Sequence, residues 1–410
     1  MKRRIVTTLA GGLSAALALS ACSGDDGTGG GGEPETGDVT SLSILDYYNN
    51  DPDKTLVQEG LDACADELGI TLERETVPGA DLIQTVLQQA SSQTLPDVLM
   101  LDNPEVQQIA ETGALLPLDE HGVSTEGFAQ GIVDASTYDG HLYGLQPVAN
   151  TIALFYNVEI LEEAGVEPPT TWDELREAAA ALTEGDQYGM AFNANATYEG
   201  SWQFLPPMWT NGGDETDLTS PEVAEALQLW VDLVESGSAS ESVINWTQGD
   251  VKDQFAAGRA AMMVNGPWNI PALNETPEVQ WDVVQFPVNE PGQTPVAPLG
   301  GEAWTVPVTG DEASQAVAVD FVECLNSPEQ QLDWAAARYT VPTRTDLAEE
   351  YLAERPEMEA FTEQVANARS RTGQLGPEWP DAATVIYEAI QLALTGQAEP
   401  AEAFEQASSR

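Results

Sequence analysis

Positive charge is the scarcest chemical property of this sequence. The 410 residues contain 14 Lys and Arg against 68 Asp and Glu, which gives a formal net charge of −54. A surface this acidic repels phosphate backbones and anionic lipid headgroups, so the composition excludes nucleic acid as a partner. It also disfavours a phosphate, a sulfate or an acidic sugar as the ligand, because such groups bind to Arg and Lys.

Histidine is also scarce, and the motifs of common enzymes are missing. His121 and His141 are the only histidines, and neither has the neighbours of a metal site. The sequence has no G-x-S-x-G motif and no Walker loop, and nothing in it favours a Ser-His-Asp triad. Gly27, Gly29 and Gly32 match a nucleotide-binding glycine loop, but no strand precedes them and no helix follows. We therefore expect no metal and no cofactor.

Only one long apolar run occurs, and it lies at the N-terminus. Lys2, Arg3 and Arg4 precede an apolar stretch over residues 5–19, which small residues then close. This is the layout of a secretory signal peptide, and it is too short and wrongly flanked for a membrane span. The last four residues, Leu-Ser-Ala-Cys22, resemble the bacterial lipobox, whose cysteine carries lipid. We expect a signal peptide over residues 1–21 and lipidation at Cys22.

A flexible linker is expected to follow this cysteine, so that residues 22–40 are a lipid anchor and a tether. The stretch is rich in Gly and Asp and has no large apolar residue before Val39. Such a segment does not bury enough surface to offset the entropy lost on ordering.

Cys64 and Cys324 are the two cysteines that remain after Cys22. In an oxidising exterior, a lone pair of cysteines is a candidate disulfide. Each cysteine also lies within an apolar helical pattern, so two buried free thiols are the alternative. Sequence spacing alone does not decide between them.

Strands and helices alternate from residue 41 onward. Strands are expected at 41–47, 70–77 and 97–101, and a helix over 81–89. Two further helices are expected at Asp51-Pro52 and Asn103-Pro104, where the first residue is the N-cap and the proline takes the first helical position. Three successive β-α units favour a parallel sheet covered by helices. Further on we expect a hairpin at 138–143, strands at 151–156 and 260–264, a capping box at Thr171–Glu174 that begins a helix, and helices starting at Ser220-Pro221, Asp250 and Asp311. The chain is long enough that two lobes are more natural than one core.

Tryptophan is the residue type that points to a ligand. Six tryptophans are expected in or beside loops: Trp202, Trp209, Trp246, Trp268, Trp304 and Trp379. An aromatic face beside amides and carboxylates suits a sugar, whose C–H face stacks on the ring while its hydroxyls form hydrogen bonds. Filling of the core is the ordinary explanation for a buried Trp. For Trp268 and Trp379, which adjoin Gly or Pro, we favour the ligand.

Six motifs occur in an order that is similar to one protein family. They are LPDVLMLD at 95–102, GALLPLD at 113–119, LFYN at 154–157, PTTWDEL at 169–175, MMVNGPW at 262–268 and Gly300-Gly301. Together with the lipobox, they resemble family 1 extracellular solute-binding proteins of ABC sugar importers, the group that includes maltose-binding protein. The resemblance implies an α/β, two-lobed periplasmic-binding-protein-like fold of type II, in which each lobe is a mainly parallel sheet flanked by helices, with hinge crossovers. It implies lobe one at 41–151 and 297–345, and lobe two at 152–296 and 346–410.

The resemblance also implies the residues that contact the ligand. Matched motif by motif, they are Asn49, Asn50, Asp51, Asp102, Asn103, Asn150, Tyr198, Glu199, Trp202, Trp268, Glu302 and Trp379. Leu101 stands where maltose-binding protein has a tryptophan, and Asn150 where it has a glutamate, so maltodextrin specificity is not implied. The resemblance places Cys64 and Cys324 on helices of the same lobe, which favours the disulfide.

The leading functional hypothesis is a binding protein rather than an enzyme. It would be a monomer anchored outside the cytoplasm by lipid on Cys22, and it would capture a mono- or oligosaccharide and deliver it to the permease subunits of an ABC importer by lobe closure. One alternative is a binder of another small solute, such as an amino-sugar, a polyol or a polyamine. The other is a secreted glycoside hydrolase: a carboxylate pair is conceivable in so acidic a chain, although no barrel pattern supports it.

Overall fold

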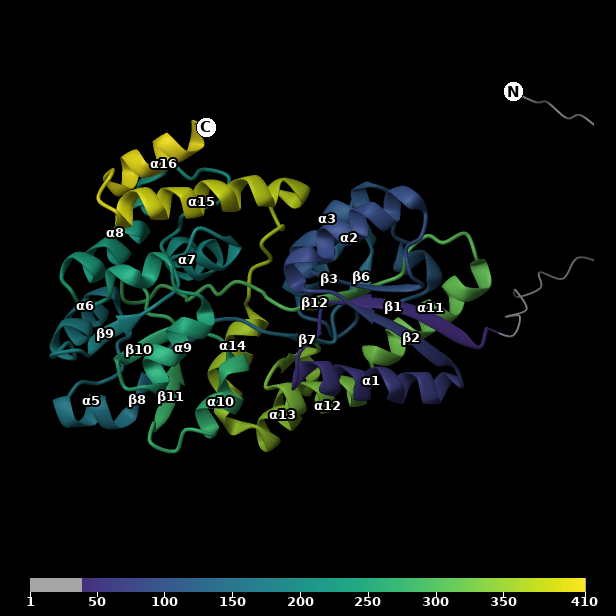
Figure 1. Cartoon of the computed structure of the whole chain (residues 1–410), viewed down its shortest axis with the longest axis horizontal. Helices are drawn as coiled ribbons and strands as arrows, with labels where there is room; N and C mark the ends of the chain where they lie inside the picture. The colour runs from purple at the N-terminus through teal and green to yellow at the C-terminus, as the bar shows by residue number, and fades with distance from the viewer. Residues whose placement is uncertain (1–38, 410) are drawn as a thin grey trace, which may run out of the picture. The chain divides into compact units, whose positions relative to one another are not determined.

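Two β-sheets organise the part of the chain that the structure describes (Figure 1). The computed structural model describes residues 39–409, which belong to one compact unit. The expected signal peptide at 1–21, the lipidated Cys22 and the linker up to residue 38 lie outside the described residues. Within residues 39–409, no helix combines the length and the apolar character that crossing a bilayer requires.

The first sheet has the strand order β2-β1-β3-β12-β6. Its strands are β1 (Ser41–Asp46), β2 (Thr71–Thr76), β3 (Val98–Asp102), β6 (Gly144–Leu145) and β12 (Glu302–Thr305). β1 runs parallel to β2 and β3, whereas β12 runs antiparallel to β3 and β6. The side chains of β3 from Val98 to Leu101 are apolar and buried, as expected for a strand covered on both faces.

Helices cover this sheet on both sides. Figure 1 shows α2 and α3 on one side of it and α1 and α12 on the other. The helices of this half are α1 (Asp53–Leu68), α2 (Gly79–Ser92), α3 (Asn103–Glu111), α4 (Gln130–Ala135), α11 (Glu312–Leu325) and α12 (Pro328–Arg338). Helices α13 (Ala348–Glu354) and α14 (Glu359–Ala366) follow α12 in the chain. Local chemistry sets several of their ends. Gly69 ends α1 in the left-handed conformation, and the Asp311 carboxylate accepts hydrogen bonds from the first backbone N–H groups of α11.

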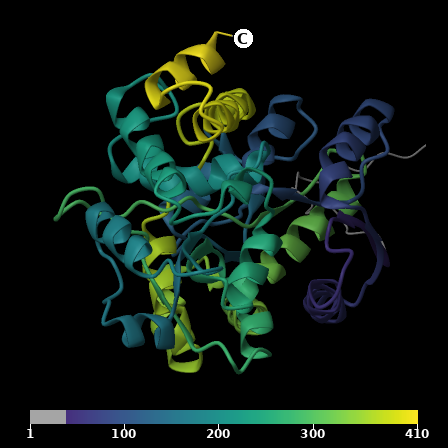
Figure 2. The same ribbon diagram turned by 60° about the vertical axis from the view of Figure 1, so that its left-hand side comes forward.

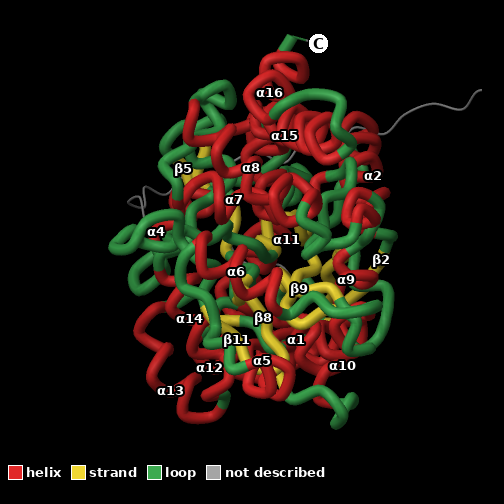
Figure 3. Tube along the Cα trace, turned by 90° about the vertical axis from the view of Figure 1, so that its left-hand side faces the viewer, coloured by secondary structure: helices red, strands yellow, loops and turns green. Residues whose placement is uncertain are grey.

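The second sheet has the strand order β11-β8-β10-β9. Its strands are β8 (Ala153–Asn157), β9 (Tyr188–Ala191), β10 (Ala260–Asn265) and β11 (Trp281–Val284). Its helices are α5 (Val158–Ala164), α6 (Trp172–Ala181), α7 (Tyr198–Thr210), α8 (Pro221–Glu235), α9 (Gln248–Ala256), α10 (Ile270–Asn274), α15 (Trp379–Leu394) and α16 (Pro400–Ser408). Figures 2 and 3 show that α8, α15 and α16 form a layer beyond α7 on one side of this sheet, while α5 lies on the other.

Small elements complete the described fold. Two short pairs of strands occur, β4 (Thr137–Tyr138) with β5 (His141–Leu142), and β7 (Val148–Ala149) with β13 (Val341–Pro342). Short 3-10 helices are η1 (Leu118–His121), η2 (Glu241–Ile244), η3 (Pro267–Asn269), η4 (Thr345–Leu347), η5 (Pro356–Met358) and η6 (Gly376–Glu378). The β4–β5 hairpin turns at Asp139 and Gly140, both with positive φ, as the sequence predicted.

Both sheets share one topological feature: a single strand runs against all the others. That strand is β12 in the first sheet and β8 in the second. Each reversed strand directly follows a segment in which the chain passes from one sheet to the other. The predicted α/β fold of two lobes, each with a mainly parallel sheet, is confirmed.

Three crossing segments connect the two halves of the fold: residues 146–152, 285–301 and 367–378. They are hydrogen-bonded side by side. Asn150 and Gly300 exchange two backbone hydrogen bonds, of 3.2 and 2.8 Å. Arg369 donates its backbone N–H to the Ala297 carbonyl at 2.9 Å and accepts from the N–H of Leu299 at 2.9 Å. The hinge region is therefore a narrow backbone ladder between the lobes.

The buried side chains form two hydrophobic clusters. One contains Leu42 and Ile44 of β1, and the other contains Phe204 and Trp230 of α7 and α8. The lobe boundary expected at residues 345/346 stays a prediction. The α13–α14 segment after it shares the first cluster, although Phe361 of α14 also packs on Phe155 of β8 in the second sheet, with ring centroids 5.8 Å apart.

A disulfide joins Cys64 of α1 to Cys324 of α11, with an S–S distance of 2.01 Å. The two residues are 260 positions apart in sequence. Both helices lie in the half of the fold that contains the first sheet (Figure 1). The structure therefore contains the bonded pair rather than the alternative of two buried free thiols.

Four expectations about helices need correction. Asp102, not Asn103, is the N-cap of α3, because the helix already includes Asn103. Pro52, not Asp51, is the N-cap of α1, and the Asp51 carboxylate accepts a hydrogen bond from the Thr55 hydroxyl instead. Thr247, not Asp250, is the N-cap of α9, because the Asp250 carboxylate bonds back to the Thr247 N–H as the second half of a capping box. Helix α7 was not expected, so Trp202 and Trp209 lie on a helix and not in loops. The predicted capping box at Thr171–Glu174 is present.

Candidate ligand-binding cleft

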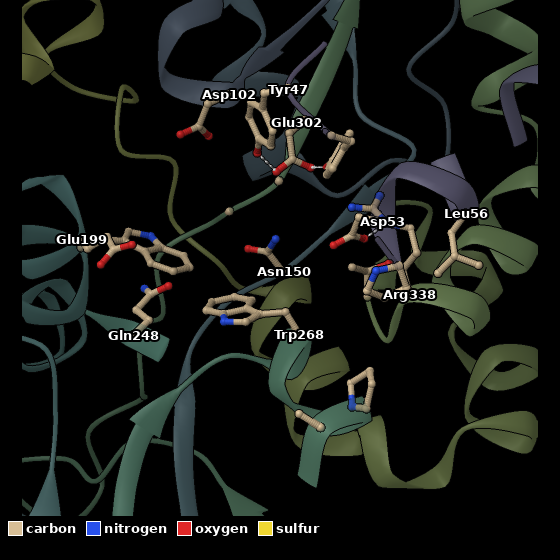
Figure 4. A pocket seen from close by; sticks show the side chains of 18 of the residues that line it. Tyr47, Asp53, Leu56, Asp102, Asn150, Glu199, Gln248, Trp268, Glu302 and Arg338 are labelled. Atoms are coloured by element: carbon tan, nitrogen blue, oxygen red, sulfur yellow. Dashed lines mark hydrogen bonds and ion pairs between the residues drawn. The ribbon is translucent and has the colours of Figure 1, made fainter. Parts of the chain in front are cut away.

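A cavity of about 680 Å³ lies where the crossing segments meet loops and helix ends from both halves of the fold. Three aromatic residues, Tyr198, Trp202 and Trp268, line one side, and we call them the aromatic wall. The other side is the polar wall, formed by Tyr47, Tyr48, Asp53, Glu302 and Arg338. In Figure 4, Trp268 faces Glu302 and Tyr47 across the cavity, with Asn150 between them. A ligand in this cavity touches elements of both sheets.

The aromatic wall is built around two stacked indoles. The rings of Trp202 and Trp268 have centroids 5.8 Å apart and an interplanar angle of 23°. The Trp202 N–H is buried and has no hydrogen-bond acceptor in the described structure. Tyr198 precedes Trp202 by one turn of α7, and 56% of its surface is exposed, which is unusual for a large apolar side chain. The wall therefore offers aromatic faces for stacking.

A glycine allows Trp268 to take this position. The chain leaves β10 through Asn265 and Gly266 and enters η3 at Pro267. A Cβ atom on Gly266 would lie 2.0 Å from the Trp268 ring, much closer than two carbon atoms approach. The Trp268 ring thus occupies the space that any other residue at 266 would need. This close approach is the physical reason for the Gly-Pro-Trp sequence at the end of β10.

The polar wall is centred on Glu302, the first residue of β12. Its carboxylate accepts hydrogen bonds from the hydroxyls of Tyr47 and Tyr48, which directly follow β1. Arg338, at the end of α12, donates from Nε to the Asp53 carboxylate at 2.8 Å, and its guanidinium lies 4.5 Å from the centre of the Tyr48 ring. Four elements of the first half therefore fix this wall.

Burial shapes the acid–base properties of the polar wall. It raises the pKa of Glu302, and the Arg338 charge and the two tyrosine donors offset only part of that rise. The pKa values of Tyr47 and Tyr48 are raised well above their ordinary value, first by burial and also by the nearby Glu302 carboxylate. Both tyrosines consequently stay protonated and act as hydrogen-bond donors.

A second charged group lies at the start of α3. Arg371, from the third crossing segment, donates to the carboxylate of Asp102 at 2.9 Å and to the side-chain oxygen of Asn103 at 3.0 Å. Beside them, burial and the Asp102 charge raise the pKa of Glu105 to about 8, although Arg371 lowers it in part. Asp102 and Arg371 line the cavity, and they join the first sheet to the crossing segments.

The floor of the cavity is the crossing ladder itself. Asn150 and Gly300 line the cavity at their shared backbone hydrogen bonds. A Cβ atom on Gly300 would lie 2.1 Å from the Asn150 side-chain oxygen and 2.9 Å from the Trp202 ring. Glycine at 300 therefore lets Asn150 and Trp202 come together beneath a ligand.

The structure brings seven of the expected site residues to the cavity: Asp102, Asn150, Tyr198, Glu199, Trp202, Trp268 and Glu302. It does not bring the other five. Asn49, Asn50 and Asp51 precede the lining residue Pro52, but their side chains bond to each other or to the first turn of α1. Asn103 is fully buried and donates to the Leu299 carbonyl, so it braces the crossing segment. Trp379 is 4% exposed, packs in the second hydrophobic cluster and does not line the cavity.

Sequence reasoning missed several residues of the cavity. Tyr47 and Tyr48 follow a parallel strand, and the rule that ligands bind at the carboxyl ends of such strands could have identified them. Arg338 and Arg371 are two of the few cations in an acidic chain, and that rarity was a usable signal. Gln248, at the start of α9, also lines the cavity, and no sequence pattern marked it as a ligand contact.

The residues of the cavity suit binding of a polar, ring-shaped molecule. The aromatic wall supplies faces for stacking, and the polar wall supplies carboxylates, phenols and a guanidinium for hydrogen bonds. No group of three or more His, Cys, Asp or Glu residues within 39–409 has the geometry to hold a metal ion. Fold and cavity together define a two-lobed protein that binds a solute between its lobes.

The chain belongs to the family of bacterial extracellular solute-binding proteins, whose family model matches residues 61–363. A maltooligosaccharide ABC transporter solute-binding lipoprotein of Streptococcus pneumoniae is 23% identical over 403 residues, covering 92% of this chain and 90% of that protein. The resemblance to solute-binding proteins of ABC sugar importers is thereby confirmed.

Solved structures agree with this assignment. The cyclic α-maltosyl-1,6-maltose binding protein of Arthrobacter globiformis has a TM-score of 0.79 and 25% identity, covering 90% of this chain and 97% of that one. An ABC transporter solute-binding protein of Thermotoga lettingae bound with α-D-tagatose has a TM-score of 0.78 and 25% identity, covering 90% and 98%. The first of these two structures is named for a sugar ligand and the second was solved with a sugar bound.

Proposed function

We propose that this protein captures a mono- or oligosaccharide in the cleft and delivers it to an ABC importer. The observation that carries the proposal is the stack of Trp202 and Trp268 opposite a wall of carboxylate and phenol groups. Sugars need both surfaces at once, because their rings have an apolar face and a polar edge. The residues we propose as ligand contacts are Asp102, Asn150, Tyr198, Glu199, Trp202, Trp268 and Glu302.

Binding would be coupled to closure of the lobes about the crossing segments. The aromatic wall belongs to α7 and η3 beside the second sheet, and the polar wall belongs to elements of the first. A sugar that contacts both walls stabilises the closed form more than the open one, which shifts the equilibrium toward closure. Permease subunits would then recognise the closed form.

The proposal also covers where the protein is located, its oligomeric state and whether it catalyses a reaction. We propose that lipid on Cys22 anchors the protein outside the cytoplasm, that residues up to 40 act as its tether, and that it works as a monomer. The relatives' names support the first point, since one of them is a solute-binding lipoprotein. We also propose that it is not an enzyme, because the similar proteins are named for binding.

The proposal is tested by calorimetry and thermal shift with a panel of mono- and oligosaccharides. A ligand that binds only the folded state raises the melting temperature by mass action. Replacing Trp268 by alanine should weaken binding of the active sugar by about 1–3 kcal/mol, the typical loss when an aromatic anchor is removed.

The matched control is Tyr138→Ala, which removes an aromatic ring from the β4–β5 hairpin outside the cavity. Its affinity for the sugar should equal that of the natural protein. Equal affinity in Trp268→Ala would contradict the proposed site, and a folded protein that binds no sugar would contradict the proposed function.

A further inference from the structure

Negative charge is in excess inside the cavity. Five carboxylates line it, from Asp53, Asp102, Glu199, Glu275 and Glu302, against two guanidinium groups, from Arg338 and Arg371. Carboxylates are frequent throughout this acidic chain, so their number in the cavity says little about the ligand. The hydrogen bonds and ion pairs of each carboxylate show which charges the protein itself compensates. Partners inside the protein neutralise some of these charges and leave others for the ligand.

Both guanidinium groups already have carboxylate partners. Arg338 bonds to Asp53 at 2.8 Å, and Arg371 bonds to Asp102 at 2.9 Å. The side chains of Arg338 and Arg371 are 7% and 9% exposed, whereas those of their partners Asp53 and Asp102 are 45% and 36% exposed, so water reaches the carboxylate side of each pair. Each arginine is paired with one carboxylate, and the other three carboxylates, from Glu199, Glu275 and Glu302, have no ion-pair partner among the described residues.

The three remaining carboxylates differ in their surroundings. Glu275 is exposed, so water solvates its charge. Glu199 lies in the first turn of α7, where the helix N-terminus favours negative charge, and accepts from the Asn193 amide at 2.8 Å. Glu302 is compensated only in part, by the nearby charge of Arg338, which already forms an ion pair with Asp53. Two neutral phenols donate to it, burial raises its pKa, and no Lys, Arg or His within residues 39–409 lies within ion-pair distance of it.

We infer that the natural ligand is a sugar that carries a protonated amino group, and that this ammonium group binds against Glu302. The inference rests on the proposed sugar-binding function and names the class of sugar. A buried carboxylate whose charge is compensated only in part is costly, and a cation brought by the ligand reduces that cost on binding. A neutral sugar adds no compensating charge, and an acidic sugar adds repulsion.

The aromatic wall is compatible with the same ligand. Indole faces attract cations as well as sugar C–H groups, and the strength of that attraction grows when water is excluded. Trp268 lies across the cavity from Glu302 (Figure 4), and its ring stacks on that of Trp202. A small aminated ring placed between the two walls meets an aromatic surface on one side and a carboxylate on the other.

The test compares neutral sugars with their amino analogues, using calorimetry on the full chain at a pH where the amines are protonated. The panel contains glucose with its 2-, 3- and 6-amino deoxy analogues, galactose with galactosamine, and cellobiose with the corresponding disaccharide of glucosamine. Each pair differs at a single type of substituent. We expect at least one amino sugar to bind about tenfold or more tightly than its neutral parent, the usual gain from a hydrogen bond between charged groups.

Glu302→Gln should remove most of that gain, because the amide keeps the shape of the side chain and loses the charge. Glu275→Gln, which removes a charge from the exposed rim, should reduce the gain much less. Glu59→Gln, on the exposed face of α1, should leave it unchanged. If Glu302→Gln does not fold, the comparison of each sugar with its amino analogue in the natural protein still decides the question.

The outcomes separate this inference from the proposed function. Neutral parents that bind as tightly as every amino analogue would overturn the inference and leave sugar binding intact. A gain for an amino sugar that persists in folded Glu302→Gln would also overturn the assignment of Glu302. A folded protein that binds no member of this panel and no other sugar would overturn the proposed function itself.

Discussion

Glu105 is a carboxyl group that the fold holds away from water. It lies in the first turn of α3, one of its oxygens is buried without a hydrogen-bond partner, and its charged neighbours are Asp102 and Arg371. Burial raises its pKa to about 8, and the Asp102 charge adds to the rise. The folded protein therefore keeps a proton on Glu105 at pH values where the unfolded chain has lost it.

The consequence is a stability that depends on pH with a known sign. Between the unfolded pKa and the folded one, the folded state binds more protons, so the free energy of unfolding falls as pH rises toward 8. Glu105→Gln imitates the protonated form at every pH. It should match the natural protein below pH 4 and be more stable above pH 8, by about 1–3 kcal/mol.

Chemical denaturation of both proteins over this pH range measures the difference. Glu59→Gln, an exposed change on α1, is the control and should show no such trend. A Glu105→Gln protein that is less stable than the natural one at alkaline pH would show that the charged form of Glu105 stabilises the fold.

At the scale of elements, the turn from β10 into η3 decides where the aromatic wall stands. The residues of β10 are buried, and Gly266, which follows the strand, has no side chain. The ring of Trp268 therefore lies where a side chain at 266 would be. An alanine at 266 would place its Cβ atom 2.0 Å from the ring. Because the ring is the far end of a side chain, the ring would move and the backbone would stay.

Gly266→Ala should therefore weaken sugar binding about tenfold or more while the protein stays folded, since it displaces a stacking ring worth about 1–3 kcal/mol. Calorimetry with the active sugar measures the loss, and circular dichroism checks the fold. Gly249→Ala, where an added Cβ atom would meet nothing closer than 3.6 Å, is the matched control. Unchanged affinity in Gly266→Ala would mean that the position of Trp268 does not matter for binding.

Helix ends that depend on hydrogen bonds between residues close in sequence could be predicted from the sequence. Contacts between residues far apart in sequence could not. The capping box at Thr171 and the αL glycine at 69 identify helix ends because their hydrogen bonds are local. Helix α7 was missed because Pro206 and Pro207 usually break a helix, and only packing in the second cluster reveals that they are tolerated. Trp379 and Trp268 both adjoin a Gly or Pro, so the sequence does not distinguish them. Trp379 is buried because it packs on residues of the second cluster that are distant in sequence.

At the scale of the whole molecule, the Cys64–Cys324 disulfide closes a loop of 260 residues that includes the second sheet. Such a closure restricts the unfolded chain, and in the chain-entropy account it stabilises the fold by about 2–5 kcal/mol. The double variant Cys64→Ala with Cys324→Ala should lose stability of that order and keep its affinity for sugar, because neither residue lines the cavity.

Denaturation of the natural and variant proteins measures the loss, and calorimetry checks the affinity. Reduction of the natural protein should reproduce the loss, whereas reduction of the double variant should change nothing. An unchanged stability in both comparisons would contradict the expected contribution of the disulfide.

The aromatic wall and the polar wall belong to different halves of the fold. This division affects the kinetics of binding. Stacking on indole faces tolerates many ring orientations, so a sugar that meets the open cleft can dock on Trp202 and Trp268 quickly and with little selectivity. The polar wall demands alignment, and it engages only as the lobes close. Rates of association should then vary little from one sugar to another, while the length of time that a sugar stays bound carries most of the discrimination.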